Sequence, residues 1–405
     1  MGFLDFFRGS RDERIARQYI KALRDAGERR RLEYDSGERV VIAFDDKGHR
    51  TQLSYLGNLT REIVAADAAV HEAIYRRYAL SAVDQADGER ASDYGLVKQR
   101  LRILLKDSSY PEYIWLLNEN DFPNGAKQSP LVFERVAGDV IACCIEEREQ
   151  GLRFVTQEDL TSWSVDAARA LSDAKANVCA LPYTVSDPNP ARYVLNDDSF
   201  IASRFVNPRM FEGLQVRGEW VAVVPDRDTL FLADSEDLET VAGLARLAQR
   251  QLEAGERIIS GLPFVLRGGR WEVYKPPESI RALFSNVALQ YRAKYWADFK
   301  VELQKSLLRR GQDIFVADIM LREVAGIDIQ FSMAAWSKDV DTILPAVDKV
   351  AFYDDEKKAT RIALWPDVVR VMGTEMHREA GLPERYRVQS FPSAQQLVAM
   401  GAKSL

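Results

Sequence analysis

Residues 219–234 read EWVAVVPDRDTLFLAD. Two apolar runs, 219–224 and 229–232, flank a turn at 225–228 that holds Pro and two Asp. Such a turn between runs of β-branched and aromatic residues is typical of a β-hairpin. Apolar residues then recur at helical spacing over 236–254, so the stretch predicts a hairpin that continues into a helix.

Three further stretches repeat this order of strand, acidic turn, strand and helix. Their strands are predicted at 40–44 with 51–55, at 140–145 with 152–156, and at 349–352 with 361–364. The helices that follow begin near residues 59, 158 and 367. Hairpins of this kind are antiparallel, so the pattern predicts an α+β fold of antiparallel hairpins packed on helices rather than a doubly wound parallel sheet.

The chain divides at two breaks. A length of 405 residues exceeds what one compact core holds, so we expect two to three domains. Residues 81–95 are polar and aperiodic, and the prolines at 276 and 277 end helices and central strands. We predict an N-terminal helix–hairpin–helix domain over 1–92, a central α+β domain over 93–276 and a C-terminal α+β domain over 277–405.

The central part also holds a distinctive set of short motifs. Residues 197–204 read DDSFIASR, residues 224–228 read VPDRD, and the second hairpin strand ends Ala-Asp at 233–234. An acidic pair before Ala-Ser-Arg, followed by these two strand ends, resembles the YtpQ-like family of bacterial proteins over roughly residues 150–276. The resemblance implies a central YtpQ-like domain and implies no particular activity.

Two apolar stripes predict long helices, because their members recur at spacings of three and four. The first stripe is Ile63, Ala66, Val70, Ile74 and Tyr78. The second is Trp296, Phe299, Leu303 and Leu307. We expect each set to lie on one helical face that is turned toward a core.

Composition places the chain among soluble globular proteins, with 46% apolar and 29% charged residues. A net charge of -6 lacks the basic footprint of nucleic-acid binding, so we expect no nucleic-acid partner. No apolar run approaches the length of a membrane span, and the start MGFLDFFR lacks the pattern of a signal peptide. These features predict a cytoplasmic protein.

The usual signatures of catalysis and cofactor binding are missing from the sequence. It contains no Gly-rich phosphate loop, no dinucleotide fingerprint after a strand and no Gly-x-Ser-x-Gly elbow. His49, His71 and His377 have no metal-ligand spacing to another His or Cys. We therefore predict no metal site, and the sequence leaves the cofactor unknown.

Acidic and arginine residues of the central segment remain as candidates for a site. Asp226 and Asp228 fall at the tip of the predicted hairpin, whereas Asp234 falls at its opposite end. Asp often hydrogen-bonds its own backbone in turns, which favours a turn-forming role, although an Asp-x-Asp pair can also hold one divalent ion. The candidate set for anion binding or for a structural cluster is Arg204, Arg227, Asp198, Asp226, Asp228 and Asp234.

Arg204 follows the small residues Ala202 and Ser203 at the end of a strand-like run. Because Arg forms bidentate bonds with carboxylates, we expect a buried structural pair with Asp198 or Asp228. Phosphate is the other group that a guanidinium binds well, so an anion-binding role is the alternative.

The first 31 residues are more basic than the rest, with nine Lys/Arg against five Asp/Glu. Apolar residues of this segment, at positions 3, 4, 6 and 7, precede a predicted helix with a basic stripe. A solvated helix face is the favoured interpretation; the alternative is weak contact with a membrane surface or an acidic partner. The stripe consists of Arg11, Arg14, Arg17, Lys21 and Arg24.

These observations favour a non-enzymatic interaction or regulatory module that binds a protein partner. The alternative is a metal-dependent hydrolase or transferase that acts on an anionic substrate. That enzyme would use the Asp/Arg cluster to hold its metal and its substrate.

Overall fold

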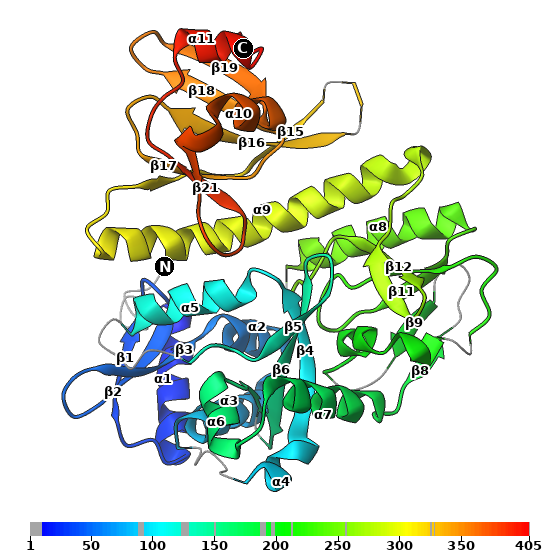
Figure 1. Cartoon of the computed structure of the whole chain (residues 1–405). Coiled ribbons are helices and arrows are strands. Elements are labelled where there is room, and N and C mark those ends of the chain that lie inside the picture. Colours follow the sequence, from blue (N-terminus) through cyan, green and yellow to red (C-terminus); the bar gives the residue numbers. More distant parts are fainter. Residues whose placement is uncertain are drawn as a thin grey trace, which may run out of the picture.

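The structure is a computed structural model. It shows a long helix, α9 (Glu278–Arg309), that lies between the C-terminal strands and the rest of the chain (Figure 1). Helices and mainly antiparallel sheets occur throughout the described residues, so the predicted α+β fold is confirmed. The described residues are 10–87, 93–122, 129–149, 151–186, 192–195, 199–211, 214–255, 257–324, 326–327 and 329–404.

The N-terminal part is an antiparallel sheet, in the order β1-β2-β3, with helices before and after it. Its elements are α1 (Arg11–Asp25), β1 (Arg31–Asp35), β2 (Val40–Phe44), β3 (Arg50–Tyr55), α2 (Gly57–Ala65), η1 (Ala68–Val70) and α3 (His71–Asp87). Helix α1 begins with a capping box in which Ser10 and Glu13 each accept the other's backbone N–H. Its buried face carries Ile15 and Tyr19, which share a core with Val41 of β2.

The predicted apolar stripe from Ile63 to Tyr78 is divided between α2 and α3. Asp67 has an extended backbone, and its carboxylate accepts a hydrogen bond of 3.0 Å from the Ala69 N–H. Val70, which was expected to face a core, is 47% exposed. The prediction of one helical face is wrong here because a local Asp cap starts a new helix within the pattern.

The first central sheet consists of β4, β5, β6 and β7, and β6 pairs antiparallel with the other three strands. Helix α7 lies against β4 and β6, where Leu171 and Val178 join a core with Ile103 and Cys144. The elements are α4 (Tyr94–Val97), η2 (Lys98–Arg100), β4 (Leu101–Asp107), α5 (Tyr110–Asp121), β5 (Phe133–Ala137), β6 (Val140–Arg148), β7 (Gly151–Phe154), α6 (Gln157–Trp163) and α7 (Ala167–Cys179).

The second central sheet has the order β13-β12-β10-β11-β9-β8, and all its neighbouring strands are antiparallel. Helix α8 packs on β10 and β11 and ends at Gly255, whose φ of 78° suits a residue without a side chain. The elements are β8 (Thr184–Ser186), β9 (Arg192–Leu195), η3 (Ala202–Val206), η4 (Pro208–Phe211), β10 (Trp220–Val223), β11 (Phe231–Asp234), α8 (Leu238–Ala254), β12 (Pro263–Arg267) and β13 (Arg270–Val273).

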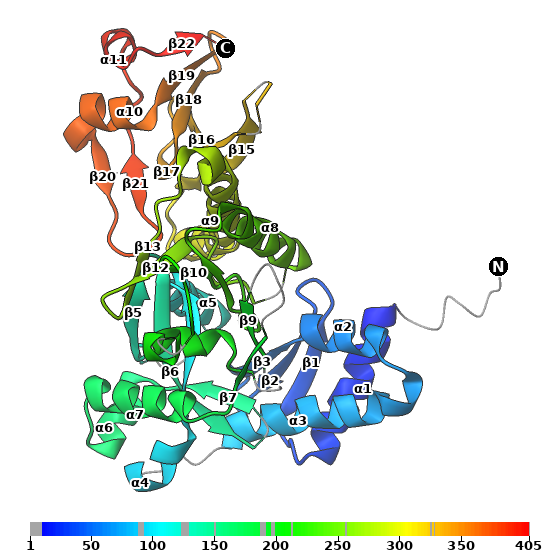
Figure 2. The same cartoon turned by 90° about the vertical axis from the view of Figure 1, so that its right-hand side faces the viewer.

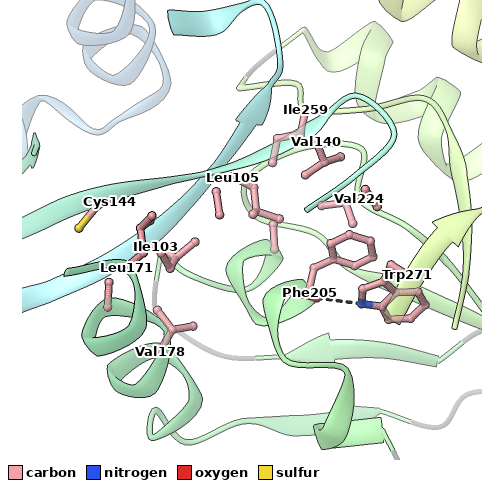
Figure 3. Close-up of a cluster of buried hydrophobic side chains, with 14 of the residues drawn as sticks. Ile103, Leu105, Val140, Cys144, Leu171, Val178, Phe205, Val224, Ile259 and Trp271 are labelled. Atoms are coloured by element: carbon pink, nitrogen blue, oxygen red, sulfur yellow. Dashed lines mark hydrogen bonds between the residues drawn. The ribbon is translucent and has the colours of Figure 1, made fainter. Parts of the chain in front are cut away.

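Side chains from both central sheets meet in one continuous core (Figure 3). The Trp271 indole stacks on the Phe205 ring at 4.7 Å and donates a hydrogen bond of 2.8 Å to the Phe205 carbonyl. The turn between β5 and β6 reaches this core through Gly138, which has a φ of 51°. A Cβ atom at Gly138 would lie 2.9 Å from Val273, so only glycine permits this close approach.

The C-terminal part contains two sheets, in the orders β14-β17-β21-β20 and β15-β16-β18-β19-β22. Two pairs, β14–β17 and β16–β18, are parallel, and the others are antiparallel. The elements are β14 (Phe315–Val316), β15 (Met320–Glu323), β16 (Gln330–Ser337), β17 (Thr342–Pro345), β18 (Lys349–Asp354), β19 (Ala359–Leu364), α10 (Trp365–Met372), η5 (Gly373–Glu375), β20 (Met376–Arg378), β21 (Arg385–Val388), α11 (Ala394–Ala399) and β22 (Lys403–Ser404).

All four predicted hairpins are confirmed, as β2–β3, β6–β7, β10–β11 and β18–β19, and a helix follows each. The second stripe is confirmed as well, because its four residues are buried on α9. The sheets fall within the ranges 1–92, 93–276 and 277–405, while the division into three domains stays a prediction.

Candidate anion-binding site

The predicted site residues lie around the loop that joins β10 to β11. Asp226, Arg227 and Asp228 belong to this loop, and Asp234 ends β11 opposite Trp220, at the far end of the hairpin. The hairpin therefore separates Asp234 from the other two carboxylates, as the sequence predicts.

Asp226 is a turn-forming residue. Its Oδ1 accepts hydrogen bonds from the Asp228 N–H at 2.8 Å and from the Thr229 hydroxyl at 2.9 Å. Burial raises the pKa of Asp226, because the charged carboxylate is removed from water. These bonds fix the loop, so the turn-forming interpretation is confirmed for this residue.

Asp234 closes the other end of the hairpin. Its carboxylate accepts backbone hydrogen bonds from Arg217, Gly218 and Glu236 at 2.9–3.1 Å. Burial alone would raise the pKa of Asp234, but these backbone N–H donors lower it. The residue thus ties the segment before β10 to the start of α8.

Arg204 lies in η3 and is 1% exposed, so the expectation that it is buried is confirmed. Its Nη2 donates a hydrogen bond of 2.7 Å to the Pro182 carbonyl. Asp198, one of the two expected carboxylate partners, lies outside the described residues. Asp228, the other, forms ion pairs with Arg227 and Arg257.

Three cations interact through their charges at this loop: Arg227, Arg257 and Lys106, which lies near the end of β4. The Arg227 N–H donates to the Arg257 carbonyl at 3.1 Å, so the two arginines lie on paired backbone segments. Asp228 is the carboxylate between them, at 3.4 Å from Arg227 Nε and 3.6 Å from Arg257 Nη1. We call Lys106, Arg227 and Arg257 the cationic cluster.

Arg257 is the exposed member of the cationic cluster. Lys106 is half-buried, the side chain of Arg227 is 17% exposed, and that of Arg257 is 42% exposed. The charge of Arg257 also acts on the hydroxyl of Tyr78 in α3, so Arg257 lies near the N-terminal part. Solvent reaches the cluster at the exposed side chain of Arg257.

Lys106 has an unusual environment for an ammonium group. Its Nζ lies 4.5 Å from the centre of the Tyr110 ring, and among the residues that the structure describes it makes no ion pair with a carboxylate. Burial, with the positive charges of Arg227 and Arg257, lowers the pKa of Lys106 to about 8. An added anion would stabilise all three cations.

Two carboxyl groups, the buried Asp107 and the half-buried Asp139, lie where β4 ends. Asp107 accepts hydrogen bonds from the Ser109 N–H and hydroxyl, and Asp139 accepts one of 2.6 Å from the Ser260 hydroxyl. Burial, with the nearby charge of Asp107, raises the pKa of Asp139 to about 7. Of the His, Cys, Asp and Glu residues in the described ranges, no three come together to hold a metal ion.

Sequence reasoning found Arg227 and Asp228 but missed Lys106 and Arg257. Lys106 carried a signal, since it interrupts the apolar strand run LRILLKD at 101–107 and a lysine in a buried strand needs an explanation. The sequence contains no such signal for Arg257, because only the pairing of residues 224–227 with 257–260 brings this residue to the site.

No family model matches the chain, and no curated protein or solved structure is found to be similar to it. The resemblance to the YtpQ-like family stays a prediction. Within the described residues, no helix is both long enough and apolar enough to cross a membrane. The geometry of the site is therefore the basis on which a function can be proposed.

Proposed function

We propose that the chain is a non-enzymatic interaction module that binds an anionic ligand at the cationic cluster. The environment of Lys106 carries this proposal. Its ammonium lies over the Tyr110 ring and forms no ion pair with a carboxylate among the described residues, and the charges of two arginines that share one carboxylate act on it. A phosphate or carboxylate group, free or carried by a protein partner, is the ligand that fits this charge.

The cationic cluster should bind an anion because the charge of the Lys106 ammonium is not compensated by a carboxylate. A buried ammonium near two guanidinium groups is costly, because desolvation and like-charge repulsion both disfavour it. The lowered pKa of Lys106 records this cost. An anion would offset it, and the two guanidinium forks supply the directed hydrogen bonds that a phosphate or carboxylate accepts.

The metal-dependent hydrolase or transferase has less support. Asp226 uses Oδ1 for two hydrogen bonds within its own turn, and Asp228 forms ion pairs with two arginines. Because both carboxylates are engaged in these interactions, Asp226 and Asp228 are not arranged to bind one divalent ion together. The cluster gathers positive charge, which favours an anion over a metal.

The test is thermal unfolding of the full chain in phosphate, pyrophosphate and citrate, with chloride at matched ionic strength. A ligand that binds the folded state stabilises it by about 2.7 kcal/mol at a hundredfold excess over its Kd. Lys106→Met and Arg257→Gln should each abolish this gain. Arg270→Gln removes an exposed arginine of β13 and should retain it.

Met keeps the apolar stem of Lys106 against Tyr110, so the variant isolates the loss of charge. Unfolding temperatures that respond to no anion would contradict the proposal. An equal response in all three variants would contradict it as well.

A further inference from the structure

We propose that the exposed face of α1 docks on an anionic lipid bilayer. Four basic side chains lie along this face at spacings of three, three and four, and all are exposed. With a rise of 1.5 Å per residue they extend over about 15 Å on one side of the helix. They are Arg11, Arg14, Arg17 and Lys21, and we call them the basic row.

The opposite face of α1 holds the helix in place. Ile15, Ala16, Tyr19 and Leu23 are at most 4% exposed and lie in the N-terminal core. The basic row is thus presented on a fixed scaffold and does not depend on a partner for its order. Figure 2 shows α1 on the outer flank of the N-terminal part, away from the central sheets.

The charges of the basic row are not neutralised within the protein. Across the described ranges, none of its members forms an ion pair with a carboxylate. The acidic residues of the first turn are engaged elsewhere, because Asp12 pairs with Arg39 at 2.9 Å and Glu13 accepts from the Ser10 N–H at 2.9 Å. The row is therefore available to a negatively charged surface.

The adjoining sequence favours a bilayer over other polyanions. Phe3, Leu4, Phe6 and Phe7 come shortly before α1 and lie outside the described residues. Aromatic and leucine side chains next to a basic helix face are typical of segments that enter the boundary between headgroups and acyl chains. A nucleic-acid backbone would contact the basic row but gives such apolar side chains no comparable environment.

The experiment measures sedimentation of the full chain with vesicles of phosphatidylcholine alone or mixed with phosphatidylserine. The wild-type chain should bind the mixed vesicles and release them as salt is raised, because the Debye length shortens. The quadruple variant R11Q/R14Q/R17Q/K21Q should lose at least about tenfold in partitioning, since each cation near an anionic surface contributes. Gln retains helix propensity, so α1 should stay folded.

A matched control changes four exposed arginines elsewhere to Gln and has the same net charge. These are Arg246, Arg250, Arg270 and Arg322. The control should bind mixed vesicles like the wild type, and all three chains should unfold at similar temperatures. Substitution of Phe3, Phe6 and Phe7 by Ser should weaken vesicle binding without changing the unfolding temperature.

Equal partitioning of the quadruple variant and the wild type would overturn the proposal. So would binding of the wild type to duplex DNA or to polyglutamate that is as tight as binding to mixed vesicles, since the row would then serve a soluble polyanion. Equal binding to both kinds of vesicle would also overturn it, because the anionic lipid would have no role.

Discussion

The carboxylate of Glu112 accepts a hydrogen bond from Arg385, which lies 273 residues further along the chain. Its second oxygen accepts from the Leu382 N–H at 2.8 Å. Glu112 belongs to α5 and Arg385 to β21, so the contact joins the C-terminal sheets to the central part. Gly381 permits it, because a Cβ atom there would overlap the Glu112 carboxylate.

We expect Glu112→Ala to lower the free energy of unfolding by about 3–5 kcal/mol. The side chain of Arg385 is 7% exposed, and the substitution would leave its guanidinium buried without this carboxylate. Chemical denaturation of the two chains measures the difference. Glu278→Ala is the control, since its ion pair with Arg281 is exposed and should contribute under about 1 kcal/mol.

A second prediction concerns the half-buried carboxyl of Asp139. Its pKa is raised to about 7, whereas an Asp in the unfolded chain titrates near 3.9. Between these values the folded state binds more protons, so Asp139 makes the protein less stable as pH rises from about 4 to 7. Asn cannot ionise and still accepts from Ser260, so Asp139→Asn should gain up to about 4 kcal/mol relative to wild type by pH 8.

The free energy of unfolding of variant and wild type is measured at several pH values. In the difference between the two, the contributions of the other titrating groups cancel. Asp237→Asn gives the opposite sign. Hydrogen bonds from Thr240 lower the pKa of Asp237, so the wild type gains stability from its charge as pH rises and the Asn variant does not. A pH-independent difference for Asp139→Asn would contradict the prediction.

The hairpins could be predicted from sequence because their determinants are local. In the pair β10–β11, a turn-forming Asp226 stands between two mainly apolar runs; β10 is buried throughout and β11 is buried at its centre. Local signals also gave one wrong prediction. The apolar pattern from Ile63 to Tyr78 continues past Asp67 in the sequence, but Asp67 caps a new helix and divides the pattern.

The cationic cluster could be predicted only in part. Arg227 is adjacent to the hairpin turn, so its place follows from the local pattern. Lys106 and Arg257 come from β4 and from the loop after α8, and they meet Arg227 through sheet pairing and packing between distant segments. Short-range periodicity contains no information on such contacts.

A third prediction concerns Arg204. Removal of its fully buried side chain in Arg204→Ala would leave a cavity and take the donor from the Pro182 carbonyl. We expect a cost of about 3–5 kcal/mol in the free energy of unfolding. Arg209→Ala, five residues later and exposed, should change stability by less than about 0.5 kcal/mol. Similar losses in the two variants would show that burial of Arg204 does not stabilise the fold.

The last prediction is that Arg257 controls the titration of Lys106. Removal of a like charge favours the protonated ammonium, so Arg257→Gln should raise the pKa of Lys106 above its value of about 8. Lysines labelled by reductive ¹³C-methylation report the midpoint in NMR spectra, and the signal missing from Lys106→Met identifies the residue. A saturating anion should raise the same midpoint in the wild type, because it stabilises the charged form. Arg270→Gln should leave it unchanged, and a midpoint near the ordinary lysine value of about 10.4 in the wild type would contradict the buried environment described for Lys106.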